Sequence, residues 1–112
     1  MFEISPSKIF VSAITVGELA YGVSKSKWGE QSRKVMQLFL STYTVLPFDE
    51  EDALIFGEIR SILYRQGLPI GPYDMQIAAQ GLSKNLTVVT HNTKEFIRIP
   101  NIKIEDWTLT TP

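Results

Sequence analysis

Three polar residues in this sequence stand where oxygen ligands for a cation could gather: Glu18, Asp74 and Asn92. Glu18 lies about one helical turn past an apolar run that ends at Ile14. Asn92 lies two residues past a second apolar run, which ends at Thr90, and Asp74 falls at the start of the helix expected to lead into that run. Carboxylate and amide oxygens are the ligands that Mg²⁺ and Mn²⁺ prefer. We therefore take these three residues as a candidate metal-binding and catalytic site for phosphodiester hydrolysis.

Each of these residues also has an ordinary structural explanation. Glu18 can pair with Thr15 in a capping box, S/T-x-x-E, that opens a helix. Asp74 can complement the positive end of a helix dipole, and Asn92 can be a turn residue. The single histidine, His91, is expected in a loop facing solvent rather than as a ligand or base. The residue types and spacing alone leave both interpretations open.

The segment 67–74 is expected to join two helices and to position Asp74. Gly67 can adopt the positive φ that ends a helix, and Pro69 prevents that helix from continuing. Pro72 suits the first turn of the next helix, which puts Asp74 near the third helical position. Free backbone N–H groups and the helix dipole favour an ionised carboxylate at that position.

Apolar runs and amphipathic patterns predict the element order β-α-α-β-α-α-β-turn-β. Strands are expected at residues 8–14, 43–48, 86–90 and 102–104. Helices are expected from residue 15, over 31–41, from 49 to about 66 and from 72, with one turn over 94–98. The acidic run 49–52 is expected to cap the third of these helices, with Asp49 as N-cap. Helices between strands imply parallel pairing, so the order predicts an α/β domain whose carboxyl sheet edge collects the three candidate residues.

Composition limits the classes of protein and site. A chain of 112 residues with 44% hydrophobic and 21% charged residues predicts one globular domain, with no internal boundary over 1–112. The absence of cysteine and the single histidine exclude disulfides, thiolate catalysis and multi-histidine metal sites. No Gly-rich phosphate loop occurs, which argues against a nucleotide-binding domain. No apolar run is long enough to span a membrane and no signal peptide is evident, so we expect a cytoplasmic protein without a membrane partner.

The net charge of −1 means that RNA contact would need a local basic patch. The basic residues that could face RNA are Lys25, Lys27, Arg33, Lys34 and Arg65. An ordinary solvated surface charge is the commoner role for each of them. Tyr21 and Trp28 could stack on bases, although packing between helices is their commoner use.

Four motifs resemble, in order, those of the PIN-domain toxins of VapBC toxin–antitoxin systems. They are SAIT-x-x-EL-x-YG at 12–22, G-x-PIGPYD-x-x-IA at 67–78, VVTHN-x-x-EF at 88–96 and IEDW at 104–107. The resemblance implies a PIN-like three-layer α/β sandwich with a mainly parallel sheet. It also implies a Mg²⁺- or Mn²⁺-dependent endoribonuclease in which Glu18 and Asp74 correspond to acidic site residues and Asn92 to a fourth ligand position. Its implied partners are structured RNA, a cognate antitoxin and a second copy in a homodimer.

The sequence also departs from that family. Members usually open with a strand that ends in Asp-Thr-Asn and is followed by two helices, and no Asp-Thr-Asn occurs in this chain. We therefore expect the first βαα unit and its acidic ligand to be absent, with a gap between the strands at 8–14 and 86–90. Unpaired edges invite other chains, so we expect the edges to close on each other, or a second copy or a separate chain to fill the gap in a strand-exchanged oligomer. An inactive toxin remnant that keeps antitoxin-binding or dimerisation surfaces is the alternative to an active ribonuclease.

Overall fold

The computed structural model describes residues 2–5, 8–90 and 92–106. Its strands are β1 (Phe2–Ser5), β2 (Lys8–Ser12), β3 (Thr44–Leu46), β4 (Thr87–Val89) and β5 (Ile104–Glu105). Its helices are α1 (Ala13–Lys25), α2 (Gly29–Thr42), α3 (Glu50–Arg65), α4 (Pro72–Ser83) and α5 (Thr93–Phe96). The predicted order is confirmed except for the added strand β1. The expectations for His91 and for the tryptophan of the last motif lie outside the described residues.

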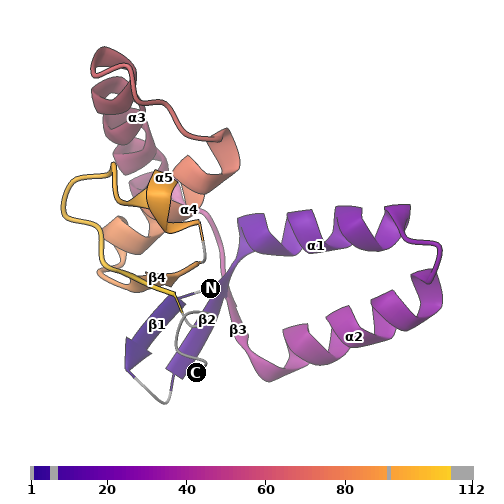
Figure 1. Cartoon of the computed structure of the whole chain (residues 1–112). Coiled ribbons are helices and arrows are strands. Elements are labelled where there is room, and N and C mark those ends of the chain that lie inside the picture. The colour runs from indigo at the N-terminus through magenta and orange to yellow at the C-terminus, as the bar shows by residue number, and fades with distance from the viewer. Residues whose placement is uncertain (1, 6–7, 91, 107–112) are drawn as a thin grey trace, which may run out of the picture.

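The strands form one sheet in the order β3-β2-β1-β4-β5 (Figure 1). β2 pairs with β3 in parallel, and β4 pairs with β5 in parallel. β1 is antiparallel to both of its neighbours, β2 and β4. Four of the five strands therefore run in one direction, which confirms an α/β fold with a mainly parallel sheet.

The expected gap in the middle of the sheet is absent, because β1 of the same chain fills it. Phe2 pairs with Phe10 of β2 on one side and with Val88 of β4 on the other. None of the three expected outcomes describes this arrangement, so that prediction was wrong. The overlooked signal was two short segments with β propensity separated by two residues, a spacing typical of a tight hairpin. Because β1 runs against its neighbours, its carboxyl end lies at the edge opposite to Asn92.

Helix α1 begins two residues earlier than predicted, which removes the structural explanation for Glu18. Ser12 is the N-cap, and its hydroxyl accepts a hydrogen bond of 3.1 Å from the backbone N–H of Ile14. The expected capping box between Thr15 and Glu18 is therefore wrong, because β2 ends at Ser12 and both residues lie inside α1. In the described part of the chain, Glu18 makes no hydrogen bond or ion pair that would explain its presence.

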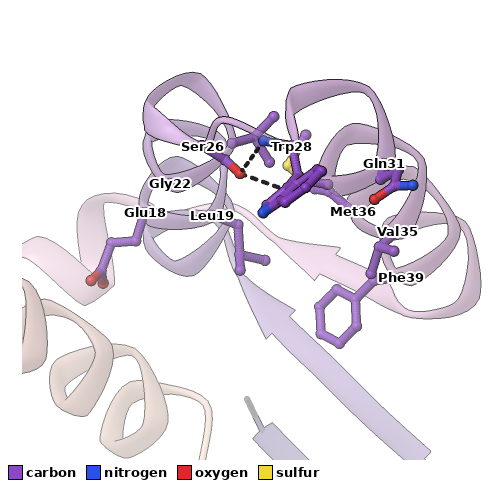
Figure 2. Close-up of a pocket in the computed structure, with 11 residues that line it drawn as sticks. Glu18, Leu19, Gly22, Ser26, Trp28, Gln31, Val35, Met36 and Phe39 are labelled. Atoms are coloured by element: carbon purple, nitrogen blue, oxygen red, sulfur yellow. Dashed lines mark hydrogen bonds between the residues drawn. The ribbon is translucent and has the colours of Figure 1, made fainter.

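Helices α1 and α2 form a hairpin that projects away from the sheet (Figure 1). Neither helix contains a buried residue. Val35 and Leu38 of α2 are 68% and 70% exposed because α2 packs mainly against α1. A groove of about 790 Å³ runs between the two helices, lined by apolar side chains that include Leu19 and Trp28 (Figure 2). The hairpin is thus an apolar surface that the described chain leaves uncovered.

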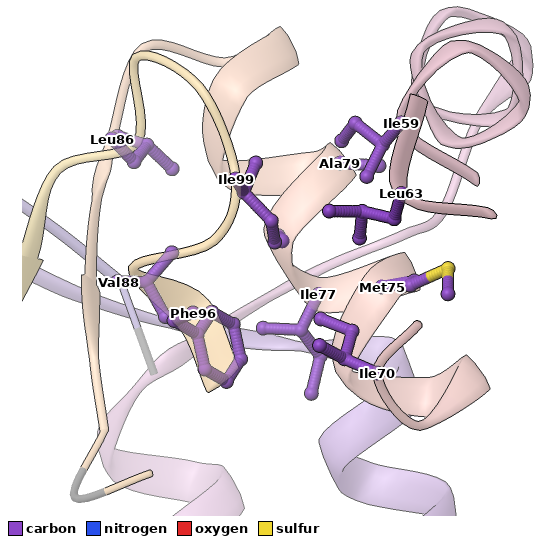
Figure 3. Close-up of a cluster of buried hydrophobic side chains, with 11 residues drawn as sticks. Ile59, Leu63, Ile70, Met75, Ile77, Ala79, Leu86, Val88, Phe96 and Ile99 are labelled. Atoms are coloured by element: carbon purple, nitrogen blue, oxygen red, sulfur yellow. The ribbon is translucent and has the colours of Figure 1, made fainter. Parts of the chain in front are cut away.

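The hydrophobic core lies between α3, α4, β4 and the segment around α5 (Figure 3). Leu63 of α3 and Ala78 of α4 are fully buried, and Met75 and Phe96 are 2% exposed. Gly67 ends the α3 segment with a φ of +68°, as predicted, and the chain then returns to start α4. This packing fixes the start of α4 and the position of α5, the two elements that carry the acidic residues of the site. No helix in the described residues is long and apolar enough to cross a membrane.

A polar cluster fastens the start of α3 to α4. The predicted N-cap Asp49 is confirmed, and it forms a reciprocal capping box with the fully buried Asp52. Lys84, the C-cap residue of α4, lies 2.7 Å from the Asp49 carboxylate and 3.4 Å from that of Asp52. The hydrogen bond to Asp49 raises the pKa of Lys84 to about 12. The buried Gln80 amide donates to the carbonyls of Leu46 and Pro47, each at 3.0 Å, and so ties β3 to α4.

Candidate active site

Asp74 lies in the first turn of α4, where the sequence predicted it. Pro72 opens the helix, and Gly71 at the N-cap offers no capping side chain. Asp74 is the acidic residue in the first turn of α4, near the free backbone N–H groups of the helix start. It is half-buried beneath the loop that follows β4, so solvent reaches it only in part.

Asn92 meets Asp74 at the carboxyl end of β4, as the sequence predicted. The Asn92 side-chain amide donates a hydrogen bond of 2.9 Å to the Asp74 carboxylate. The same nitrogen donates a second bond, of 3.1 Å, to the Glu95 carboxylate. The backbone N–H of Asn92 donates to the Thr90 hydroxyl at 3.0 Å, which holds the loop in place. One amide nitrogen thus joins two carboxylates from different elements.

Glu95 is the site residue that the sequence analysis missed. It lies in the short helix α5, three residues after Asn92, which is the N-cap position of that helix. The signal was present in the spacing N-x-x-E, because residues three apart at a helix start lie on one side. The next residue, Phe96, is buried in the core and fixes the orientation of α5. Glu95 is therefore held beside Asp74 by packing as well as by the Asn92 amide.

The surroundings of Asp74 disfavour its negative charge. Burial raises the pKa of the Asp74 carboxyl above its ordinary value of 3.8, and the neighbouring Glu95 carboxylate raises it further. The hydrogen bond from Asn92 acts in the opposite direction, but the net effect is a raised pKa. A pair of carboxylates with excess negative charge in a half-buried place is the electrostatic setting that a bound cation relieves.

This raised pKa predicts that Asp74→Asn stabilises the protein at neutral pH. The folded state binds the Asp74 proton more tightly than the unfolded state, so stability falls as pH rises above 3.8 through the raised pKa. Asparagine keeps an oxygen for the Asn92 amide but carries no charge. We expect a higher free energy of unfolding for Asp74→Asn in urea titrations with EDTA at neutral pH. The difference should shrink as pH is lowered toward 3.8, and a less stable variant at neutral pH would contradict this account.

Glu18 is not brought into this cluster. It is exposed on α1, and Figure 2 shows its carboxylate pointing away from the groove between α1 and α2. It lines a second pocket together with Tyr73, the residue directly before Asp74. Within the described ranges, no three Asp, Glu or His side chains lie close enough to hold a metal ion together. Glu18 thus shares a pocket between α1 and α4 with Tyr73, the residue next to Asp74, but it does not contact the cluster itself.

The residues of this cluster fit a hard divalent cation. Mg²⁺ is commonly held by one or two carboxylates, with waters and substrate phosphates completing its coordination. Asp74 and Glu95 supply two carboxylates, and the side-chain nitrogen of Asn92, which donates to both, holds them close to each other. Burial and the Glu95 carboxylate both raise the pKa of Asp74, and a cation at this point would offset that effect.

Known proteins are similar to this chain in sequence. The PIN domain family matches residues 2–102. The tRNA(fMet)-specific endonuclease VapC of Salmonella typhimurium is 45% identical over 106 residues, covering 95% of this chain and 80% of that protein. Ribonuclease VapC2 of Rickettsia felis is 43% identical over 99 residues, covering 88% of this chain and 74% of that protein.

Solved structures agree with these relatives. VapBC2 from Rickettsia felis, bound to a DNA fragment from its promoter, superposes with a TM-score of 0.86 at 43% identity, covering 89% of this chain and 75% of the other. DNA-bound VapBC from Salmonella typhimurium gives a TM-score of 0.87 at 46% identity, covering 90% and 76%. The chain thus belongs to the PIN-domain family and, within it, to the VapC ribonucleases.

Proposed function

We propose that this chain is a Mg²⁺- or Mn²⁺-dependent endoribonuclease toxin of the VapBC type, which hydrolyses phosphodiester bonds in RNA. The observation that carries the proposal is the pair of carboxylates, Asp74 and Glu95, joined by one Asn92 amide at the carboxyl end of β4. Its relatives of 45% and 43% identity are named as a tRNA(fMet)-specific endonuclease and a ribonuclease. Structured RNA such as tRNA is accordingly the proposed substrate class, and the cytoplasm is the proposed location.

Asp74, Glu95 and Asn92 would hold the cation, and Glu18 would approach it from α1. When bound, such a cation supplies a water of lowered pKa and offsets negative charge on the phosphodiester oxygens. Asp74 must be ionised to take part, and its raised pKa means that it gives up its proton less readily than a solvent-exposed aspartate. The Thr90 hydroxyl fixes the Asn92 backbone, so the amide stays at the position where the two carboxylates meet.

Metal binding tests the ligand set separately from catalysis. We expect Glu95→Gln and Glu18→Gln to weaken Mn²⁺ binding by about tenfold or more, since losing even a supporting partner of a metal ligand costs 10- to 100-fold in affinity. Isothermal titration of the purified chain with Mn²⁺ gives this directly. Glu58→Gln, which changes an exposed acid on α3, is the matched control and should bind as the wild type does. Unchanged affinity in Glu95→Gln would remove Glu95 from the set, and the same result for Glu18→Gln would remove Glu18.

A cognate antitoxin is the proposed protein partner. The structural neighbours of 43% and 46% identity are VapBC complexes. The uncovered groove between α1 and α2 offers an apolar surface for the antitoxin. Glu18 lines both this groove and the neighbouring pocket that contains Tyr73, the residue before Asp74. A bound antitoxin segment could thus cover the candidate active site. A homodimer completes the proposed assembly.

An inactive toxin remnant is the second candidate function. Two observations favour it. No Asp-Thr-Asn occurs in this chain, and β1 ends at the sheet edge opposite to Asn92, so the end of β1 adds no ligand beside Asn92. Such a protein would bind the antitoxin, or dimerise, without cleaving RNA. Antitoxin binding by a folded sample that shows no metal-dependent cleavage would select this function over the first.

A further inference from the structure

A pocket adjoins the candidate active site, and of its lining residues only Glu18 belongs to the proposed ligand set. It lies between α1 and the start of α4 and has a volume of about 620 Å³. Its lining residues are Ala13, Ile14, Gly17, Glu18, Tyr21 and Tyr73. The residues from α1 share one face, because they are spaced three or four apart. We call this cavity the tyrosine pocket.

Its two tyrosines are each next to a proposed metal-binding acid. Tyr21 lies one helical turn after Glu18, and Tyr73 directly precedes Asp74. A group held in the tyrosine pocket would therefore lie beside the scissile bond of a substrate bound at the acidic cluster. The other α1 residues that line the pocket besides Glu18 and Tyr21 are small or aliphatic: Ala13, Ile14 and Gly17.

Packing within the described chain does not explain these rings. Tyr21 is 65% exposed and Tyr73 is 58% exposed. Among the described residues, neither phenolic hydroxyl has a hydrogen-bond partner. A buried tyrosine contributes packing area and forms a hydrogen bond through its hydroxyl. Tyr21 and Tyr73 are exposed and lack such a bond in the described part of the chain, so neither role explains them. Apart from the Lys25 ammonium that lies over the Tyr21 ring, the described residues leave both rings open to a ligand.

Glu18 lines the tyrosine pocket, and a cation lies beside one of its rings. The Lys25 ammonium lies 4.9 Å from the centroid of the Tyr21 ring. From Tyr21 the chain runs through the end of α1 into α2, and the segment from Tyr21 to Lys34 holds four of the eleven basic residues of the chain and one of its twelve acidic residues. An aromatic surface beside a local basic segment is how proteins bind unpaired nucleotides, since bases stack on the rings and phosphates meet the cations.

We propose that the tyrosine pocket receives one unstacked nucleobase of the RNA substrate, which stacks on Tyr21 and Tyr73 while Lys25 faces a neighbouring phosphate. This inference rests on the proposed function, because it assigns the substrate contact of the same site. A base inside a duplex cannot enter such a pocket, so the chain would select unpaired segments, such as loops, within structured RNA.

The test measures RNA binding without cleavage. The probe is a hairpin RNA with 2-aminopurine in its loop, added to the protein in EDTA, where the fluorescence of the base drops when it stacks. We expect Tyr21→Ala and Tyr73→Ala each to weaken binding by about tenfold, the effect of losing one stacked base, and to restore the fluorescence. Tyr21→Phe and Tyr73→Phe keep the ring and should behave as the wild type does.

Tyr64→Ala is the matched control. Tyr64 is 57% exposed on α3 and also has a cation near its ring, with Arg60 at 5.5 Å, but it does not line the pocket. It should leave RNA binding unchanged, and a fully paired RNA should show no dependence on Tyr21 or Tyr73. Wild-type binding and quenching in both alanine variants would overturn the inference, as would a loss of antitoxin binding with RNA binding intact. Because EDTA removes catalysis, tyrosine-dependent binding without any metal-dependent cleavage would refute the proposed function alone.

Discussion

Asp74→Asn should reduce metal-dependent RNA cleavage by at least about 100-fold, in line with the loss of one electrostatic group at a catalytic centre. The substitution removes the charge that attracts the cation and keeps the size of the side chain. It also keeps an oxygen to accept the hydrogen bond from Asn92, which is 2.9 Å long in the wild type. The fold should therefore persist, and with EDTA at neutral pH we expect this variant to be the more stable protein. Initial rates on a labelled RNA with Mg²⁺ or Mn²⁺ measure the effect.

Glu58→Gln provides the matched comparison for that experiment. It also removes one negative charge, but from an exposed position on α3 that is outside the cluster of Asp74, Asn92 and Glu95. Its cleavage rate should equal that of the wild type. Cleavage that survives Asp74→Asn would show that the chemistry does not run through Asp74. Equal losses in both variants would point to a general effect of charge instead.

Phe96→Ala should lower the free energy of unfolding by about 3–5 kcal/mol, the usual cost of removing a buried aromatic side chain. Phe96 is 2% exposed and packs in the core with Val88 and Ile77 (Figure 3). A domain of this kind has a total stability of ~5–15 kcal/mol, so the variant should lose a large share of its stability and unfold at a lower urea concentration. Urea denaturation followed by circular dichroism gives the value.

The neighbouring residue supplies the control for Phe96→Ala. Ile97 is 72% exposed, and Ile97→Ala should change stability by no more than about 0.5 kcal/mol. In Phe96→Ala the helix α5 loses its anchor, so Glu95 should also lose its fixed place beside Asp74. A loss of less than about 1 kcal/mol, well below the usual range for a core aromatic, would show that α5 is not held by the core.

Local rules predicted most of the elements because glycine, proline and capping residues act within a few positions. Gly67 has the positive φ that ends a helix, Pro72 opens α4, and Asp49 caps α3, all as expected. The errors concern long-range partners. β1 is only four residues long, and its pairing with β4 joins segments more than eighty residues apart. Helical periodicity correctly marked α2, but it could not show that Val35 and Leu38 face solvent instead of a core.

The candidate site was predicted in part for the same reason. Sheet topology places the end of β4 beside the start of α4, so Asn92 and Asp74 could be paired from the order of elements alone. Glu95 was missed because its role depends on how Phe96 orients α5, which is a property of the packed core. Glu18 was assigned from its place one turn past the first apolar run and from the motif resemblance. The structure places it across the tyrosine pocket from Tyr73 and without a bond to the cluster, so its place in the ligand set stays a prediction.

The most direct test of the central claim is cleavage of structured RNA by the purified wild-type chain, with Mg²⁺ or Mn²⁺ and with EDTA. If Asp74, Glu95 and Asn92 form a competent metal site, the folded chain cleaves RNA with either cation and stops when EDTA is added. Cleavage that continues in EDTA would contradict the metal-dependent site. A folded sample that cleaves no RNA with either cation would contradict the claim that these residues suffice, and it would identify the chain as a toxin fold that binds its partners without catalysis.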